Sequence, residues 1–131
     1  MDLLPLRLSP GEDLRRALEA AGADGAFVVS GIGSLRDVRL RFAGAPEATM
    51  LPGDFEIISI AGAIAADGAH LHMAVADADG RVLGGHVVYG NLVRTTAEVL
   101  LVRVPGWQLS RPFDPATGYP ELSVRRAVES P

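Results

Sequence analysis

The sequence contains no cysteine, no lysine and no hydrophobic run long enough to cross a membrane. Without cysteine, the chain can form neither disulfides nor thiolate metal sites. Without lysine, all twelve basic residues are arginine, and sixteen acidic residues outnumber them to give a net charge of −4. An acidic chain without a dense basic segment matches a phosphate backbone poorly, so we expect no direct binding to DNA. Asp2 and Pro5 interrupt the stretch where a signal peptide would be apolar, which predicts a cytoplasmic protein.

The composition is that of a globular domain with many turn-forming residues. The 131 residues fit one domain, and 48% of them are hydrophobic, which is enough for a core. Fifteen glycines and nine prolines favour strands joined by turns over a helical bundle. We therefore predict a single α+β domain over residues 1–124, with residues 125–131 as a flexible tail.

One helix is predicted near the N-terminus. Ser9 can act as its N-cap, Pro10 suits the first helical position, and Glu12 completes a capping box. Apolar residues follow at helical spacing, and Gly22 provides the C-terminal stop. These signals predict an amphipathic helix of about three turns.

The rest of the chain predicts six or seven mostly antiparallel strands. Gly31 and Gly33 lack the third glycine and the following helix of a dinucleotide-binding motif, so we predict a tight turn there. Frequent proline and glycine between Pro105 and Leu122 predict irregular structure. The expected strands cover residues 3–8, 26–30, 36–42, 55–64, 70–76, 81–89 and 92–104.

The three histidines of the chain fall in one predicted hairpin. A type I turn with a G1 bulge at residues 77–80 would pair Asp77 with Arg81. Counting back along both strands places His72 directly opposite His86, and His70 two residues along the same face. Opposed Cβ atoms should then be about 5 Å apart and diagonal ones about 7–8 Å apart.

Three imidazoles at these separations can converge on one ion. A three-histidine site with a vacant position is typical of Zn²⁺ or Fe²⁺ centres to which water or substrate also binds. We therefore predict a metal site at His70, His72 and His86 that holds Zn²⁺, with Fe²⁺ as the alternative. In the competing interpretation, the histidines are polar residues on the exposed face of a half-buried hairpin. A slip of one residue would turn His86 to the other face and remove the site.

Two carboxylates and one arginine are further candidates for functional residues. Glu56 and Glu98 lie inside otherwise apolar strands, where a carboxylate needs a partner. Glu56 is the candidate catalytic residue, as a proton shuttle or fourth metal ligand; the alternative is solvent or an arginine such as Arg94. Arg111 precedes a Pro-Phe-Asp sequence, and we favour a structural pair with Asp114 over binding of an anion.

The sequence has Phe-Glu-Ile-Ile at residues 55–58, His-Leu-His at residues 70–72 and Gly-Gly-His at residues 84–86. Together these segments resemble the plant- and prokaryote-conserved (PPC) domain family, also called the AT-hook-associated domain. The combination of Phe-Glu-Ile-Ile with Gly-Gly-His is specific, and the resemblance extends over nearly the whole chain. The matching segments are residues 53–62 (GDFEIISIAG), 70–72 (HLH), 79–86 (DGRVLGGH) and 96–99 (TAEV), together with 30–35 and 111–122.

The resemblance implies a compact α+β fold with a twisted antiparallel sheet, one principal helix and assembly as a homotrimer. It places His70, His72 and His86 at the metal-binding positions of prokaryotic members. Plant members join the domain to a basic Arg-Gly-Arg-Pro segment, which this chain lacks. The family is also similar in fold to acetolactate decarboxylase, whose zinc is held by a comparable His-x-His and a later histidine. Metal-dependent chemistry on a small polar substrate follows as an expectation.

Two functions therefore stay open. The leading hypothesis is a homotrimer whose bound metal acts as a Lewis acid or activates a water molecule. The rival is a non-enzymatic regulatory or DNA-associated interaction module, in which trimerisation is the main role. Residues 36–42 and 92–104 supply more apolar strand surface than one helix can cover, which favours an oligomer over a monomer covered by its own C-terminal segment.

Overall fold

The computed structural model describes residues 2–128, which form one helix and ten strands. The predicted α+β class is confirmed. The elements are β1 (Asp2–Leu8), α1 (Leu14–Ala21), β2 (Ala26–Arg41), β3 (Thr49–Ala65), β4 (Gly68–Ala76), β5 (Val82–Val87), β6 (Leu92–Arg103), β7 (Trp107–Ser110), β8 (Phe113–Asp114), β9 (Tyr119–Pro120) and β10 (Ser123–Arg126).

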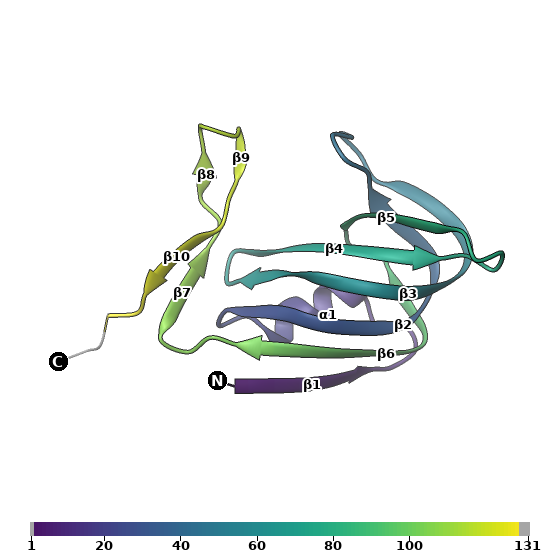
Figure 1. Cartoon of the computed structure of the whole chain (residues 1–131), viewed down its shortest axis with the longest axis horizontal. Coiled ribbons are helices and arrows are strands. Elements are labelled where there is room, and N and C mark those ends of the chain that lie inside the picture. Colours follow the sequence, from purple (N-terminus) through teal and green to yellow (C-terminus); the bar gives the residue numbers. More distant parts are fainter. Residues whose placement is uncertain (1, 129–131) are drawn as a thin grey trace.

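The first six strands form one antiparallel sheet in the order β1-β6-β2-β3-β4-β5 (Figure 1). β5 also pairs with the far end of β2, where Leu40 lies opposite Val87 and Arg41 lies opposite His86. Strands β2, β3, β4 and β5 therefore close on themselves. This closure brings the end of β2 beside the β4–β5 hairpin, which carries all three histidines.

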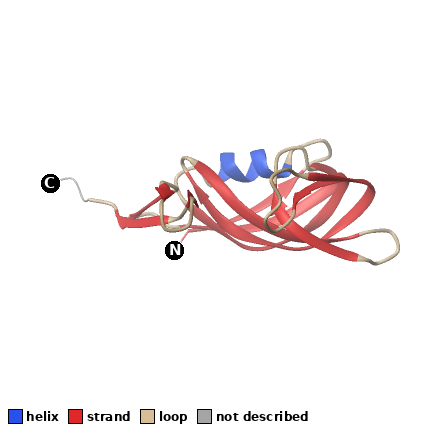
Figure 2. Cartoon of the chain, turned by 90° about the horizontal axis from the view of Figure 1, so that it is seen from above, coloured by secondary structure: helices blue, strands red, loops and turns tan. Residues whose placement is uncertain are grey.

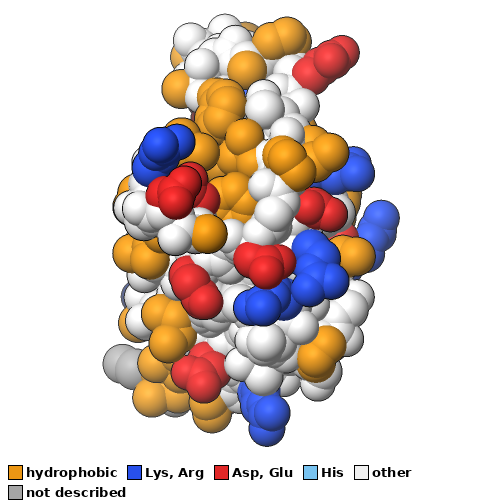
Figure 3. Space-filling model, turned by 90° about the vertical axis from the view of Figure 1, so that its right-hand side faces the viewer, with side chains coloured by type: hydrophobic (Ala, Val, Ile, Leu, Met, Phe, Trp, Pro, Cys, Tyr) orange, Lys and Arg blue, Asp and Glu red, His pale blue; other side chains and the backbone are white. Residues whose placement is uncertain are grey.

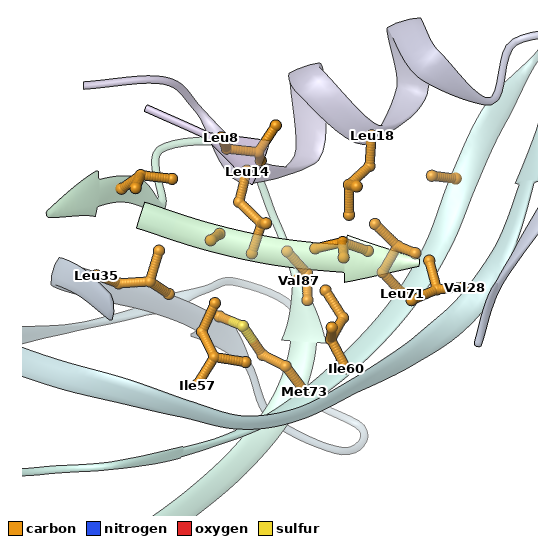
Figure 4. Close-up of a cluster of buried hydrophobic side chains, with 14 of the residues drawn as sticks. Leu8, Leu14, Leu18, Val28, Leu35, Ile57, Ile60, Leu71, Met73 and Val87 are labelled. Atoms are coloured by element: carbon orange, nitrogen blue, oxygen red, sulfur yellow. The ribbon is translucent and has the colours of Figure 1, made fainter. Parts of the chain in front are cut away.

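Helix α1 covers one face of the sheet (Figure 2). Leu14 and Leu18 on its inner side are fully buried, and each contributes roughly 1.5–3 kcal/mol to folding by leaving water. Figure 4 shows them above the inward-facing side chains of the strands, Val28, Leu35, Ile57, Ile60, Leu71, Met73 and Val87. Because side chains alternate along a strand, the neighbours of these residues face away from the helix.

The start of α1 differs from the prediction. Asp13, not Ser9, is the N-cap, and its carboxylate accepts a hydrogen bond from the backbone N–H of Arg16 at 3.1 Å. The Ser9 N–H instead donates to the Glu12 carboxylate at 2.6 Å in a turn that precedes the helix. Gly22 ends the helix as predicted. Because the helix starts later than predicted, α1 has eight residues rather than three full turns.

Strand β2 runs without a break through residues 31–33, so the predicted tight turn is wrong. A Cβ on Gly33 would lie 2.7 Å from the Cα of Ala97 on the neighbouring strand β6. The glycine therefore permits a close approach of two strands and does not mark a turn.

The C-terminal segment, which we define as residues 107–126, leaves the main sheet and forms two small antiparallel pairs, β7 with β10 and β8 with β9 (Figure 1). The prediction of irregular structure before Leu122 is therefore wrong. The predicted domain boundary at residue 124 falls inside β10, where Arg125 and Arg126 pair with Gln108 and Trp107. Residues 129–131 of the predicted tail lie outside the described residues.

Charges of both signs share the surface. On the end of the molecule shown in Figure 3, acidic and basic side chains lie beside one another. Within residues 2–128, no helix is long and apolar enough to cross a membrane.

Candidate metal centre

The hairpin that carries the histidines has the predicted register. The Asp77 N–H donates to the Arg81 carbonyl at 2.9 Å, and the Gly80 N–H donates to the Asp77 carbonyl at 3.0 Å. Gly80 has φ +78°, the left-handed conformation that a G1 bulge requires. His72 consequently lies directly opposite His86, which confirms the pairing derived from the turn.

The three imidazole rings form a compact cluster. One ring nitrogen from each of His70, His72 and His86 lies within 4.8 Å of the others. The rings of His70 and His86 stack with centroids 5.4 Å apart, and the ring of His72 stands nearly perpendicular to both at 4.7 and 4.5 Å. Since a Zn–N bond is about 2.0–2.1 Å long, small ring rotations would bring all three nitrogens to one ion.

The two faces of the hairpin differ in burial. The side chains facing the helix and buried in the core are Leu71, Met73, Val75 and Val87. From alternation along the strand we also expect Leu83 and Tyr89 on this core face, but both are exposed because they lie at the two ends of the hairpin. The histidines project from the opposite face, where Ala74 and Gly84 leave space above the sheet.

Two arginines lie next to the cluster. Arg41 pairs directly opposite His86 through the closure of β2 onto β5. The Nη2 atom of Arg111 lies 3.3 Å from Nδ1 of His70 and donates to the Pro120 carbonyl at 3.1 Å. The backbone N–H of Arg111 donates to both carboxylate oxygens of Asp67, at 3.0 and 2.9 Å, instead of the expected pair with Asp114.

Burial and these arginines lower the pKa of two of the rings, which favours their neutral form. Burial lowers the pKa of His70, Arg111 and His72 lower it further, and Glu121 opposes them. Burial also lowers the pKa of His86, with Arg41 as the next cause. A neutral imidazole offers the lone pair that a metal ion needs.

The metal-free protein should therefore lose stability as the pH falls below the ordinary histidine pKa of 6.5. Above that value the rings are neutral in both the folded and unfolded chain. Below pH 6.5 the unfolded chain binds protons more readily than the folded His70 and His86 do. The free energy of unfolding therefore decreases as the pH is lowered. As the pH is lowered below 6.5, we expect the Tm of the metal-free wild type to drop more steeply than that of a His70→Gln/His86→Gln double variant. Equal slopes in thermal melts of the two proteins would contradict this account.

The contact with Arg111 also fixes the tautomer of His70. A guanidinium only donates hydrogen bonds, so Nδ1 of His70 must accept, and the neutral ring carries its proton on Nε2. Nε2 of His70 lies 3.0 Å from Nε2 of His72, which then accepts a hydrogen bond from it. A cation bound to Nε2 of His70 requires the tautomer that carries its proton on Nδ1. The Nδ1–H group would then face the N–H groups of Arg111, which also donate. A metal ion bound at Nε2 would therefore displace Arg111 from His70.

A pocket of about 550 Å³ opens beside His70 and His86. One wall comes from the hairpin and the end of β2, and the other comes from the C-terminal segment. Its charged lining consists of Arg15, Arg41, Asp67, Arg111 and Glu121. The volume is within the range of small-molecule sites.

The predicted carboxylates lie elsewhere. Glu56 pairs opposite Ala76, four residues along β4 from His72, which is about 13 Å at the rise of a strand. Glu98 is exposed and lies opposite Arg7 on β1. Among the described residues, the metal-ligand group contains the three histidines without either glutamate. Asp67 and Glu121, which line the pocket, were not singled out from the sequence because each lies in a turn or irregular segment with no motif.

The sequence profile of the Plants and Prokaryotes Conserved (PCC) domain matches residues 1–105. The chain belongs to this family. The structure of this PCC domain is similar to that of a hypothetical protein from Salmonella enterica, at 38% identity and a TM-score of 0.92, covering 97% of this chain and 95% of that one. It is also similar to a metal-containing protein from Archaeoglobus fulgidus, at 27% identity and a TM-score of 0.78, covering 92% of each chain. A plant- and prokaryote-conserved protein from Pyrococcus horikoshii shares the fold at 23% identity and a TM-score of 0.75, over 92% of this chain and 90% of that one.

The PCC domain also matches part of a larger protein. It is 44% identical over 130 residues to the bifunctional protein GlmU of Synechococcus sp. strain JA-3-3Ab, covering 96% of this chain. The chain spans 21% of the length of that relative. All three histidines and Arg41 lie inside the matched residues 1–105, whereas Arg111 and Glu121 lie beyond them.

Proposed function

We propose that this PCC domain binds one divalent metal ion, Zn²⁺ or alternatively Fe²⁺, through His70, His72 and His86. The observation that carries the proposal is the convergence of three ring nitrogens within 4.8 Å on a hairpin whose register is fixed by its turn. Three nitrogen ligands suit either ion. The similar protein from Archaeoglobus fulgidus is described as metal-containing, which supports the proposal.

A metal-dependent reaction on a small polar substrate is the activity that this site best supports. When bound, the ion would supply Lewis acidity or a water molecule of lowered pKa. Three protein ligands leave one position of a four-coordinate site for water or substrate. The residues of the chain itself contribute a pocket of about 550 Å³ beside two of the histidines, with guanidinium groups in its wall.

We further propose that the chain assembles as a homotrimer through the sheet face that α1 leaves uncovered. Three large apolar side chains on this face, Val29, Ile32 and Ile58, are 55%, 54% and 52% exposed. A cluster of this kind marks an interaction surface. A cyclic trimer would bury such a patch against a neighbouring copy in a head-to-tail contact.

Metal content tests the proposed site directly. The full chain should be purified without an affinity tag, stripped with a chelator, freed of that chelator, and titrated with Zn²⁺ and with Fe²⁺ under anaerobic conditions. We expect about one ion per chain by calorimetry and by elemental analysis. Failure of the wild-type chain to bind either ion stoichiometrically would overturn the proposal.

A further inference from the structure

The guanidinium groups of two arginines in the pocket beside the histidines form no ion pair with a carboxylate of the described residues. The ion pairs among residues 2–128 involve Arg15, Arg36, Arg94 and Arg103. Arg41 donates from Nη1 to the Ala45 carbonyl, and Arg111 uses Nη2 for Pro120 and His70. A guanidinium carries five N–H donors, so most donors of both half-buried side chains have no partner in the described part of the chain.

The other charged groups of the pocket are already engaged. Arg15 forms an ion pair with Glu19 at 2.8 Å and donates to two backbone carbonyls. Asp67 accepts two hydrogen bonds from the backbone N–H of Arg111, and Glu121 accepts one from the Thr117 hydroxyl at 3.1 Å.

The charge balance of the pocket is opposite to that of the whole chain. Three arginines and two carboxylates line the pocket, whereas the chain as a whole has a net charge of −4. Arg15 is balanced by Glu19, which leaves the two guanidinium groups with unused donors, Arg41 and Arg111, beside two carboxylates that already accept hydrogen bonds. An oxyanion would satisfy the unused donors of Arg41 and Arg111.

We propose that Arg41 and Arg111 bind the oxyanion group of a small molecule, a carboxylate or a phosphate, in the pocket beside the histidine cluster. The planar fork of a guanidinium matches either group with two parallel hydrogen bonds. The inference rests on the proposed function in one respect, since it names the substrate class of that metal site. It places the anionic group of the substrate next to His70 and His86.

The contact between Arg111 and His70 connects the two ligands. A metal ion on Nε2 of His70 displaces the Arg111 guanidinium from Nδ1, because two donors would then face each other. The released donor then becomes available to an anion in the pocket. Zn²⁺ and the anion should therefore each strengthen the binding of the other.

Calorimetry on the full chain can test this proposal with inorganic phosphate and malonate as probes, which distinguish a phosphate from a carboxylate ligand. We expect one of the two to bind the Zn²⁺-loaded protein more tightly than the metal-free protein. Arg41→Met and Arg111→Met should each weaken that binding at least about tenfold, because each removes a charge-assisted contact. Zn²⁺ should still bind these variants at one ion per chain, and Arg111→Met should bind it at least as tightly as the wild type.

Arg81→Met is the matched control. It removes the same charge from the exposed turn of the hairpin and should leave both Zn²⁺ and anion binding unchanged. Thermal melts of all variants establish that they fold. The anion site would be overturned if an Arg41→Met/Arg111→Met double variant still bound the probes as tightly as the wild type. It would also be overturned if the wild type bound neither probe at millimolar concentration. Neither outcome would affect the proposed metal site. A wild type that binds a probe but no metal would overturn the proposed function instead.

Discussion

His72→Ala should abolish stoichiometric Zn²⁺ binding while leaving the fold intact. The substitution removes one of three converging nitrogens, and the side chain of His72 is exposed, so no core contact is lost. A metal bound only by the native state stabilises the wild type by about 2.7 kcal/mol at a free metal concentration one hundred times the Kd. The variant should therefore show no rise of Tm on addition of Zn²⁺, measured by thermal melts alongside calorimetry and elemental analysis.

Val82→Ala provides the comparison for this experiment. It shortens an exposed side chain on the same hairpin, outside the histidine cluster, and should retain one Zn²⁺ per chain and the metal-dependent rise of Tm. Retention of stoichiometric Zn²⁺ by His72→Ala would show that the ion is bound by other groups.

The second large effect concerns assembly. Light scattering of the wild-type chain at micromolar concentration should give a mass near 41 kDa, three times the 13.7 kDa of one chain. An Ile32→Asp/Ile58→Asp double variant should shift that mass to 13.7 kDa, because a carboxylate without a partner in an apolar interface costs several kcal/mol. Circular dichroism would show whether the variant keeps its strands.

Val82→Asp adds a carboxylate at another exposed apolar position, on β5, and should leave the mass of the wild type unchanged. A wild-type mass of 13.7 kDa that does not change on concentration would exclude the trimer. Dissociation by Val82→Asp but not by the double variant would place the interface on a different face.

The histidine cluster could be predicted from the sequence because its geometry is local. The turn residues Asp77 and Gly80 determine the register of the hairpin, and the period of two along a strand then determines which side chains share a face. A mostly antiparallel sheet with one helix could be predicted on similar grounds, from alternation and from the stop signal at Gly22.

The wall of the pocket could not be predicted, because it depends on contacts between distant parts of the chain. Arg41 reaches His86 only through the closure of β2 onto β5, and Arg111 is held by Asp67, a residue 44 positions away. Glycine at position 33 was misleading for a related reason: it serves the packing of β2 against β6, whereas a local interpretation predicts a turn. The helix start was misplaced because the carboxylate of Asp13 also binds the N–H of Gly90 at 2.6 Å, a tertiary contact that favours it over Ser9.

The two walls of the pocket come from different stretches of sequence, and this division has a consequence for how such proteins can diversify. The histidine hairpin and Arg41 belong to the stretch that the family profile matches, whereas Arg111 and Glu121 belong to a segment outside the main sheet and beyond that profile. Replacing that segment would leave the core beneath the hairpin unchanged, since the buried cluster under α1 takes no side chain from it. The segment that carries Arg111 and Glu121 can therefore change in sequence without altering the buried residues that support the histidine hairpin.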